Sequence, residues 1–370
     1  MLHAAPSAFS GEVEIGVEPL FDFLAEEYST LFRGSCASAF QAPHWLAGLH
    51  TRLAPELGAH QHTVTVRAKA DGKLLAVFPF VRQSTAGILI LQPADFGLCD
   101  RNEPVASRET LEMLAAFPEH ITRLAAALGR PDLLLMRKVW EGSFDIIRLF
   151  PGARAWNAPN SAYRCETGDE FAGWKQDLRK KFTKELDRLQ RQTARDIGTY
   201  QHRVVTDPNE IKLAFEFLRL ARLGRHKGDV LEDDRFYEFY RDYAIEGAQT
   251  GESITYASFV DGYPVAVLFG LAGDGEFHAV LIGADFGKLS RQSTGIQLLY
   301  RVVQMRIAQG YTVFDMGLGD PGYKAHFRPR KIRVHNVTRP MTPTGHAAAF
   351  IYNRTKPLKN LIKGLLPNVH

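Results

Sequence analysis

The chain has 370 residues, which is enough for two compact domains. With 45% hydrophobic and 23% charged residues it has the composition of an ordinary globular protein, and a net charge of +4 is too small to indicate nucleic-acid binding, although it permits an anionic ligand. The three cysteines, Cys36, Cys99 and Cys165, are scattered without metal-ligand spacing, so we expect no metal. No apolar stretch is long enough to cross a bilayer and no secretory signal is evident. The scattered, odd-numbered cysteines make a reducing cytoplasm the simplest compartment.

The first half of the chain predicts a helical start followed by a small sheet. In chain order we expect two short helices, a hairpin, a third strand, a longer helix and a fourth strand, over residues 20–32, 45–53, 62–83, 87–92, 109–128 and 132–137. The hairpin turns at Asp71-Gly72, a dipeptide suited to a tight turn, and Gly129 closes the longer helix.

A basic helical region lies between the two halves. Residues 174–195 contain eight lysines and arginines against three acids, with apolar residues at helical spacing. A solvated surface face is the simplest interpretation, and binding of RNA or an acidic polymer is the alternative.

The second half repeats elements of the first. One offset relates Asp71-Gly72 to Asp261-Gly262, and the same offset relates Ala94–Gly97 to Ala284–Gly287. Two separate matches at one offset indicate an internal duplication of one α/β unit.

Residues 277–327 carry the most information in the second copy. They predict a strand, a polar loop, a helix opening at Ser293 or Thr294, a second strand parallel to the first, and a glycine-rich loop ending in Tyr323-Lys324. The start of such a helix is an anion site, because its first amides lack partners and carry the positive end of the helix dipole. The first copy lacks the corresponding basic and glycine residues, so we expect the second copy to bind the ligand and the first to support it.

These elements resemble the GNAT acyltransferase fold, and in particular the cellulose-biosynthesis-associated acetyltransferases, which are related to the Fem-type peptidoglycan aminoacyltransferases. The residues that carry the resemblance are Trp174, Leu178-Arg179-Lys180, Arg225-His226-Lys227, Phe236-Tyr237, Asp261-Gly262, Ser293-Thr294-Gly295, Phe314–Gly317, Gly322-Tyr323-Lys324 and Phe327. The family's usual phosphate loop has two glycines spaced by one residue, whereas this loop has the single Gly295.

The resemblance implies an α/β (α+β) fold of two tandem GNAT-like units. Each unit would have a mixed, mostly antiparallel sheet with a strand–helix–strand crossover and flanking helices. We expect a degenerate N-terminal unit over residues 1–160, an acyltransferase unit over 161–345, and a basic tail helix over 346–370.

The resemblance also assigns candidate site residues. Residues Arg291, Gln292, Ser293, Thr294, Gly295 and Ile296 would hold the pyrophosphate of acetyl-CoA or another acyl-CoA. Candidate catalytic residues are Tyr323, Lys324, Asp315 and His278. Candidate substrate-binding residues are Trp174, Arg179, His226, Lys227 and Asp285. A lone strand histidine such as His278 more often has a structural role, and the recurrence of Asp285 as Asp95 in the first copy favours a turn-forming role for both aspartates.

The leading functional hypothesis is therefore an N- or O-acyltransferase. It would transfer an acetyl or acyl group from acyl-CoA to an amino or hydroxyl acceptor, which the family association suggests to be a cell-surface polysaccharide precursor. One alternative is a Fem-type transferase that uses aminoacyl-tRNA, with the basic helix contacting the tRNA. The other is a non-catalytic binding module in exopolysaccharide assembly.

Overall fold

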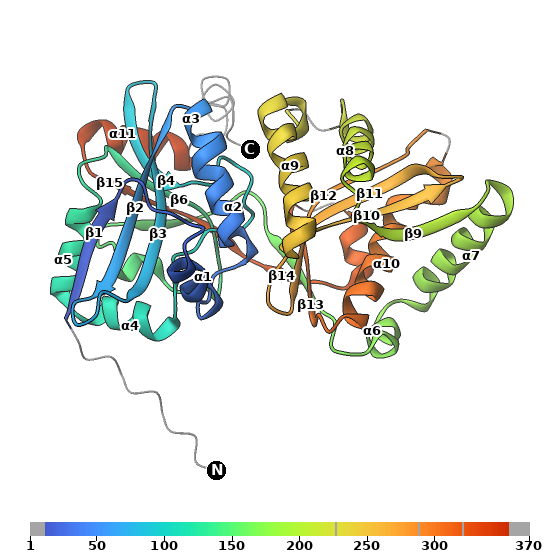
Figure 1. Ribbon diagram of the computed structural model, residues 1–370, viewed down its shortest axis with the longest axis horizontal. Helices are drawn as coiled ribbons and strands as arrows, with labels where there is room; N and C mark the ends of the chain where they lie inside the picture. The colour runs from blue at the N-terminus through green and yellow to red at the C-terminus, as the bar shows by residue number, and fades with distance from the viewer. Residues whose placement is uncertain (1–11, 226–227, 288, 320–321, 355–370) are drawn as a thin grey trace, which may run out of the picture. The chain divides into compact units, whose positions relative to one another are not determined.

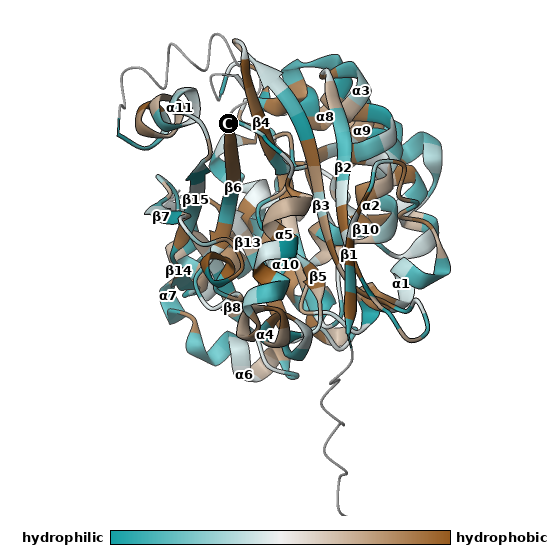
Figure 2. Cartoon of the chain, turned by 90° about the vertical axis from the view of Figure 1, so that its left-hand side faces the viewer, coloured by the Kyte–Doolittle hydropathy of each residue, from teal (hydrophilic) through white to brown (hydrophobic). Residues whose placement is uncertain are grey.

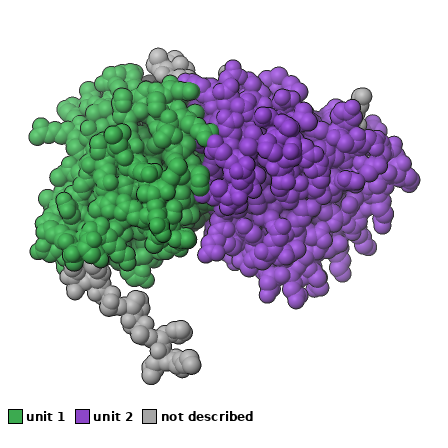
Figure 3. Space-filling model, viewed as in Figure 1, with its two compact units in different colours: residues 1–158, 335–370 green, residues 159–334 purple. Residues whose placement is uncertain are grey.

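The computed structural model describes residues 12–225, 228–287, 289–319 and 322–354. The chain divides into two compact units (Figure 3): unit 1 comprises residues 1–158 and 335–370, and unit 2 comprises residues 159–334. The second boundary therefore lies before residue 345, where the sequence placed it, because the strand and helix that follow unit 2 complete unit 1. Residues 355–370 of the predicted tail helix lie outside the described part of the chain.

Unit 1 is built on an eight-stranded sheet of order β1-β2-β3-β4-β6-β15-β7, with β5 paired to β3 (Figure 1). Its strands are β1 (Val13–Glu18), β2 (Ala59–Ala68), β3 (Leu74–Thr85), β4 (Ile88–Pro93), β5 (Val105–Ala106), β6 (Leu133–Trp140), β7 (Arg154–Asn157) and β15 (Val334–Pro340). Strands β1 to β4 form an antiparallel meander, and β4 and β6 run parallel.

The helices of unit 1 pack against this sheet. They are α1 (Glu26–Arg33), α2 (Pro43–Gly48), α3 (Ala54–Glu56), α4 (Arg108–Ala116), α5 (Pro118–Ala127) and α11 (Pro343–Arg354), with short helical turns at Ala39–Gln41, Leu49–Leu53 and Ile146–Arg148. The single helix predicted over residues 109–128 is two helices, because Pro118 lacks an amide hydrogen and begins a new helix. Apolar residues, brown in Figure 2, line β4 and β6 and join the core that α4 and α5 cover.

Unit 2 is built on a seven-stranded sheet of order β14-β8-β13-β12-β11-β10-β9. Its strands are β8 (Ala162–Glu166), β9 (Tyr200–Val205), β10 (Ser253–Val260), β11 (Tyr263–Ala272), β12 (Glu276–Ala284), β13 (Val313–Leu318) and β14 (Arg330–Ile332). Its helices are α6 (Phe171–Asp177), α7 (Lys180–Asp196), α8 (Pro208–Arg222), α9 (Asp234–Thr250) and α10 (Thr294–Ala308), with 3-10 turns at Val230–Glu232, Ser290–Gln292 (η5) and Gly322–Phe327 (η6).

Helices α8 and α10 cover opposite faces of the unit 2 sheet. A side chain added at Gly283 would meet Leu218 of α8 at 2.8 Å, whereas one added at Gly295 of α10 would meet Ala284 at 3.1 Å. Successive strand residues such as Gly283 and Ala284 point to opposite faces, so β12 is sandwiched between the two helices. This sandwich fixes the position of the α10 N-terminus at the end of β12.

The duplication predicted from the sequence is confirmed in the order of elements. The series β2, β3, β4, α4–α5, β6 in unit 1 corresponds to β10, β11, β12, α10, β13 in unit 2. The repeated aspartate forms the same turn in both units: the carboxylate of Asp95 accepts from the Gly97 amide at 3.2 Å, and that of Asp285 from the Gly287 amide at 2.6 Å. Among the described residues, no helix combines the length and apolar character needed to cross a bilayer.

Candidate functional site

The parallel strands β12 and β13 of unit 2 separate after three rungs. Their pairing covers Glu276–Val313, Phe277–Phe314 and His278–Asp315, although β12 continues to Ala284 and β13 to Leu318. Beyond the last rung, the facing edges of both strands lack the partner that a parallel ladder would supply. The strands therefore open a backbone edge inside the unit rather than at the rim of the sheet.

A β-bulge lies on β12 immediately after the point of separation. The register with β11 pairs Phe269 with Leu281 and Gly270 with Ala279, which leaves Val280 as the extra residue. Gly270 is required here, because a side chain at that position would meet the Phe277 ring at 2.3 Å and the His278 carbonyl at 2.4 Å. Val280 is thus without a ladder partner on either neighbouring strand.

The last rung before the separation is a buried histidine–aspartate pair. His278 Nδ1 lies 2.9 Å from Asp315 Oδ2, and both side chains are buried. The other carboxylate oxygen of Asp315 accepts from the Gly317 amide at 2.9 Å. His278 Nε2 lies 3.6 Å from Glu276, which in turn is paired with Arg164 at 2.9 Å. This chain of charged groups crosses three neighbouring strands and holds the base of the opening.

The start of α10 is not capped by a side chain. Ser293 occupies the N-cap position but makes no side-chain cap hydrogen bond, and Thr294 Oγ1 donates instead to the Val265 carbonyl at 3.2 Å. The expectation that Ser293 or Thr294 caps the helix is therefore wrong. The amides of Gln292 and Ile296 bond to the carbonyls of Leu289 and Ser293.

The amides of residues 293–295 are consequently left at the helix start without a partner among the described residues, where an anion is stabilised. Ser293 has the left-handed backbone conformation, with φ of 52°, that normally favours glycine. One residue separates Ser293 from Gly295, which is the spacing of the two glycines in the resembled family. Arg291, in the preceding turn, is exposed to solvent and can approach the same anion.

The two residues at the end of the glycine-rich loop have different surroundings. Lys324 is buried, and its ammonium donates to the carbonyls of Gly317, Leu318 and Gly319 at 3.0, 2.9 and 3.4 Å. An ammonium has three N–H donors, so these bonds use them to hold the end of β13. Tyr323 is half-buried, and this burial raises the pKa of its phenol although the nearby Arg222 opposes the shift.

Arg222 links Tyr323 to the open edge of β12. Its guanidinium donates to the Ile282 carbonyl at 2.9 Å and pairs with the buried Asp229 at 2.8 Å. The residue was not identified from the sequence, because an arginine in the last turn of a helix is ordinary and its partner on β12 is distant in the chain. Arg164 and Glu276 were also missed, because they lie on strands that are distant from each other in the chain.

The other predicted site residues are spread over unit 2. Trp174 is buried in the core, where its ring stacks on Phe327 at 6.3 Å, and Arg179 is exposed at the start of α7. Asp285 forms the loop turn described above. His226 and Lys227 lie outside the described residues. Among the residues that the structure describes, no group of three histidine, cysteine or acidic side chains is placed to hold a metal ion.

Helix α7 presents a basic face to solvent. Three basic side chains on α7 and the adjacent α6 form ion pairs with acids. These pairs are Lys175 with Asp187, Arg188 with Glu185 and Arg195 with Asp196. The remaining exposed cations make no ion pair among the described residues: Arg179, Lys180, Lys181, Lys184 and Arg191. Five unpaired cations on one short stretch form a surface that attracts anions.

Comparison with known proteins agrees with this geometry. Residues 179–325 match the family model described as acetyltransferase (GNAT) domain. No protein with curated annotation matches the sequence significantly. The matched segment contains the strand separation, the uncapped helix start and Tyr323-Lys324.

Several solved structures share the fold of nearly the whole chain at low sequence identity. FemX aligns with a TM-score of 0.62 and 10% identity over 91% of this chain and 98% of its own. The structure of L-PGS from Bacillus licheniformis aligns with a TM-score of 0.53 and 14% identity over 91% of this chain and 96% of its own. A conserved protein from Bacteroides thetaiotaomicron aligns with a TM-score of 0.57 and 12% identity over 88% of this chain and all of its own. Residues 179–325 thus match a GNAT acetyltransferase domain, and the chain as a whole shares the fold of FemX.

Proposed function

We propose that this protein transfers an acyl group from acyl-CoA, with acetyl-CoA as the simplest donor, to an amino or hydroxyl acceptor. The observation that carries the proposal is the uncapped start of α10 beside the open edge of β12, inside the segment that matches the GNAT family. The free amides at the helix start suit the donor's pyrophosphate, and the unpaired strand edge suits its acyl end. The acceptor suggested by the family association is a cell-surface polysaccharide precursor, and the proposed compartment is the cytoplasm.

In the proposed reaction the amides of residues 293–295 and the guanidinium of Arg291 hold the pyrophosphate. The acceptor's nitrogen or oxygen attacks the thioester carbonyl between β12 and β13. Backbone amides along the open edge of β12, next to the Val280 bulge, stabilise the oxyanion of the tetrahedral intermediate. The carbon–sulfur bond then breaks, and Tyr323 gives its proton to the departing thiolate. The acceptor's nitrogen or oxygen loses its proton to solvent, and solvent returns a proton to the Tyr323 phenolate.

Tyr323 suits this role because its raised pKa keeps the phenol protonated at neutral pH. The buried pair of His278 and Asp315 would instead fix the point at which the strands separate, since each is engaged by the other and by backbone or a charged neighbour. Lys324 would act in the same way, by holding the end of β13.

A ligand screen tests the proposal directly. Thermal unfolding is followed with acetyl-CoA, longer acyl-CoAs and free CoA, and then CoA thiol release is measured with amine and hydroxyl acceptors. At a ligand concentration of one hundred times the dissociation constant, binding adds about 2.7 kcal/mol of stability, which raises the melting temperature measurably. The absence of both a shift and thiol release would contradict the proposal and favour the non-catalytic binding module.

A second candidate donor, aminoacyl-tRNA, is favoured by the five unpaired cations on and beside α7. If tRNA binds there, its affinity falls steeply with salt, with a slope in log–log form of roughly one per phosphate contact. Reversing three charges together, Lys180→Glu, Lys181→Glu and Lys184→Glu, should then weaken tRNA binding by more than tenfold. Lys212→Glu on the exposed face of α8 is the control and should leave it unchanged. A salt-independent or mutation-independent complex would exclude this donor, whatever the outcome with acyl-CoA.

A further inference from the structure

Unit 1 contains a cavity that the proposed reaction does not use. Its volume is about 210 Å³, well above the roughly 10–15 Å³ that holds a single water molecule. All of its lining residues belong to unit 1 and come from the loop after α1, the segment around β5, the start of α4 and the end of β6. Its apolar wall is formed by Leu111, Met136, Val139, Phe144 and Ile146.

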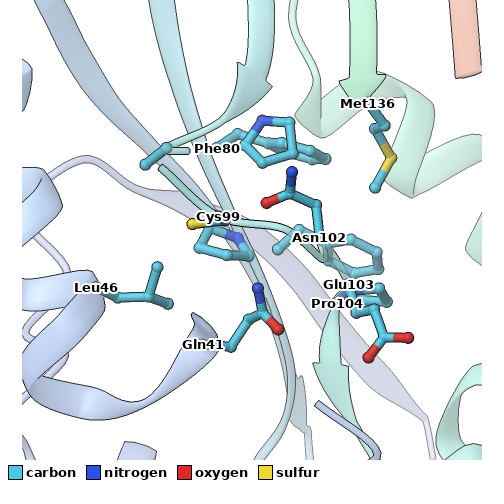
Figure 4. A pocket seen from close by; sticks show the side chains of 12 residues that line it. Gln41, Leu46, Phe80, Cys99, Asn102, Glu103, Pro104 and Met136 are labelled. Atoms are coloured by element: carbon cyan, nitrogen blue, oxygen red, sulfur yellow. The ribbon is translucent and has the colours of Figure 1, made fainter. Parts of the chain in front are cut away.

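A narrower hollow adjoins this cavity and shares Asn102, Glu103, Pro104 and Met136 with it (Figure 4). The hollow has a volume of only about 10 Å³, room for one water molecule at most. In Figure 4 the carboxylate of Glu103 points away from Leu46 and Cys99, which lie on the far side of the hollow. The larger cavity is therefore the one that a small molecule can enter.

The charged groups of the cavity are arranged around one fixed arginine. Arg101 donates from Nη2 to Glu103 Oε1 at 2.8 Å, and its guanidinium lies 5.1 Å from the centre of the Trp140 ring. Glu103 is buried and also accepts from the Ser143 hydroxyl. These contacts fix the plane of the Arg101 guanidinium in the cavity wall, with one acid to offset its charge.

A second arginine has no such acid. Arg108, the first residue of α4, lines the same cavity and is exposed, and its guanidinium makes no ion pair or hydrogen bond among the residues that the structure describes. With two arginines and one glutamate, the lining has an excess positive charge beside an apolar wall. A cation is disfavoured by this charge, and a wholly apolar ligand would leave Arg108 unused.

We propose that this cavity binds a small organic carboxylate with an apolar body, such as a short aliphatic chain or a single aromatic ring. The carboxylate pairs with Arg108 and with the outer edge of Arg101, and the body packs on the wall formed by Leu111, Val139 and Phe144. This site lies wholly in unit 1, and it stands whether or not unit 2 transfers acyl groups.

The chain provides its own reporter for this site. Cys36 is exposed and lines the cavity, whereas Cys99 and Cys165 are buried, and burial raises the pKa of both buried thiols. A neutral disulfide reagent should therefore modify Cys36 first in the folded protein, because the thiolate is the reacting form and the other two are inaccessible. A ligand that occupies the cavity slows this modification.

The test measures the rate of Cys36 modification with 4,4′-dithiodipyridine in the presence of hexanoate, benzoate, hexan-1-ol or hexylamine. Hexanoate and benzoate should protect Cys36 in a saturable manner, and the alcohol and amine should protect it at least tenfold more weakly. Arg108→Ala should raise the half-protecting concentration of hexanoate about tenfold, and Arg130→Ala, an exposed arginine at the end of α5, should not change it.

Protection that is absent, or equal for hexanoate and hexylamine, would overturn the proposal, and this comparison needs no variant. Equal protection of the wild type and Arg108→Ala would also overturn it. Arg108 is exposed, so the variant is expected to fold, and its melting temperature checks this.

Discussion

The two units share one scaffold but differ at the place where their parallel strands separate. In unit 1 the space after β4 is closed by the chain itself: the Asn102 amide donates to the Lys138 carbonyl at 3.1 Å, and buried Asp95 accepts from Arg137 on β6 and from Asn102 at 2.8 Å. In unit 2 the side chain of the corresponding Asp285 has, among the described residues, the Gly287 amide of its own loop as its hydrogen-bond partner. The chain's own side chains and backbone therefore close the junction in unit 1, whereas the strands stay apart in unit 2.

The crossover helices differ in the same sense. Helix α4 of unit 1 is capped, because Ser107 Oγ accepts from the Thr110 amide at 3.1 Å. Helix α10 of unit 2 begins at Ser293 without a side-chain cap. The two copies thus differ because, among the described residues, unit 2 lacks the chain's own partners at a strand edge and at a helix start, which is the basis of the proposed donor site.

The largest expected effect is on acyl-CoA affinity, and it distinguishes the second residue of α10 from the second residue of α4. Gly295→Leu should abolish acyl-CoA binding, with at least a hundredfold loss of affinity by calorimetry, because a side chain there meets Ala284 at 3.1 Å and covers the free amides. Glu109→Leu, at the second position of α4, is the matched change in unit 1 and should leave donor affinity unchanged. If the two variants bound acyl-CoA with equal affinity, the start of α10 would not be the donor site that distinguishes unit 2 from unit 1.

Tyr323→Phe should lower kcat by about a hundredfold, the usual contribution of a proton donor, with little change in the KM for acyl-CoA. Its phenol has a pKa raised by burial, so kcat of the wild type should show no loss from its ionisation below about pH 10. Tyr263→Phe, an exposed tyrosine on β11, serves as control. A fall in melting temperature that accounts for the lost turnover would assign Tyr323 to the fold instead.

Acid should distinguish the stabilities of the two units. Burial lowers the pKa of His50 in unit 1 to about 3, and burial together with the nearby Arg301 lowers that of His202 in unit 2 to about 4. Both are neutral when folded and bind a proton more readily when unfolded, so their stabilising effect is complete above about pH 6.5 and is lost as the pH falls towards these values. Between the pKa of the unfolded state and that of the folded state, each histidine lowers the free energy of unfolding by up to about 1.4 kcal/mol per pH unit.

The measurement is the urea midpoint at pH 7 and pH 5 for the wild type, His50→Leu and His202→Gln. Each substitution should reduce the loss of stability between the two pH values. Burial also lowers the pKa of His62 in unit 1. We therefore expect unit 1 to unfold before unit 2 as the pH is lowered. Substitutions that leave the pH dependence unchanged would show that other groups control it.

The smallest effects are expected at the N-caps themselves. Ser107→Ala should cost about 1 kcal/mol of unfolding free energy, the usual value of a capping hydrogen bond, whereas Ser293→Ala should cost little because no such bond exists. Ser293→Gly should be neutral or stabilising, since glycine relieves the left-handed backbone at φ of 52°. Equal losses from the two alanine variants, measured by urea unfolding, would contradict the contrast between the helix starts.

Features encoded by neighbouring residues were predictable from the sequence. The turns at Asp71-Gly72 and Asp261-Gly262, and the aspartate turns at Asp95 and Asp285, are local and recur at one offset, so they revealed the duplication. The crossover of unit 2 followed from helical and strand periodicity. In unit 1 the same periodicity ran across Pro118 and concealed the break between α4 and α5.

Features set by pairing between distant strands were not predictable. His278 and Asp315 are 37 residues apart and meet only because their strands share a rung. The internal bonds of Lys324 depend on a loop conformation that the glycines permit but do not specify. The chemistry attached to single residues was therefore less certain from the sequence than the scaffold that carries them.

The place of β15 in the unit 1 sheet determines the order in which the protein is completed during synthesis. Strand β7 finds its antiparallel partner in β15, whose residues are translated after all of unit 2. Unit 2 is one continuous segment and has its full sheet available earlier, whereas the β6 side of unit 1 waits with unpaired backbone groups. Unit 1 is thus finished after unit 2, and a ribosome stalled before residue 334 would leave unit 1 with an exposed sheet edge.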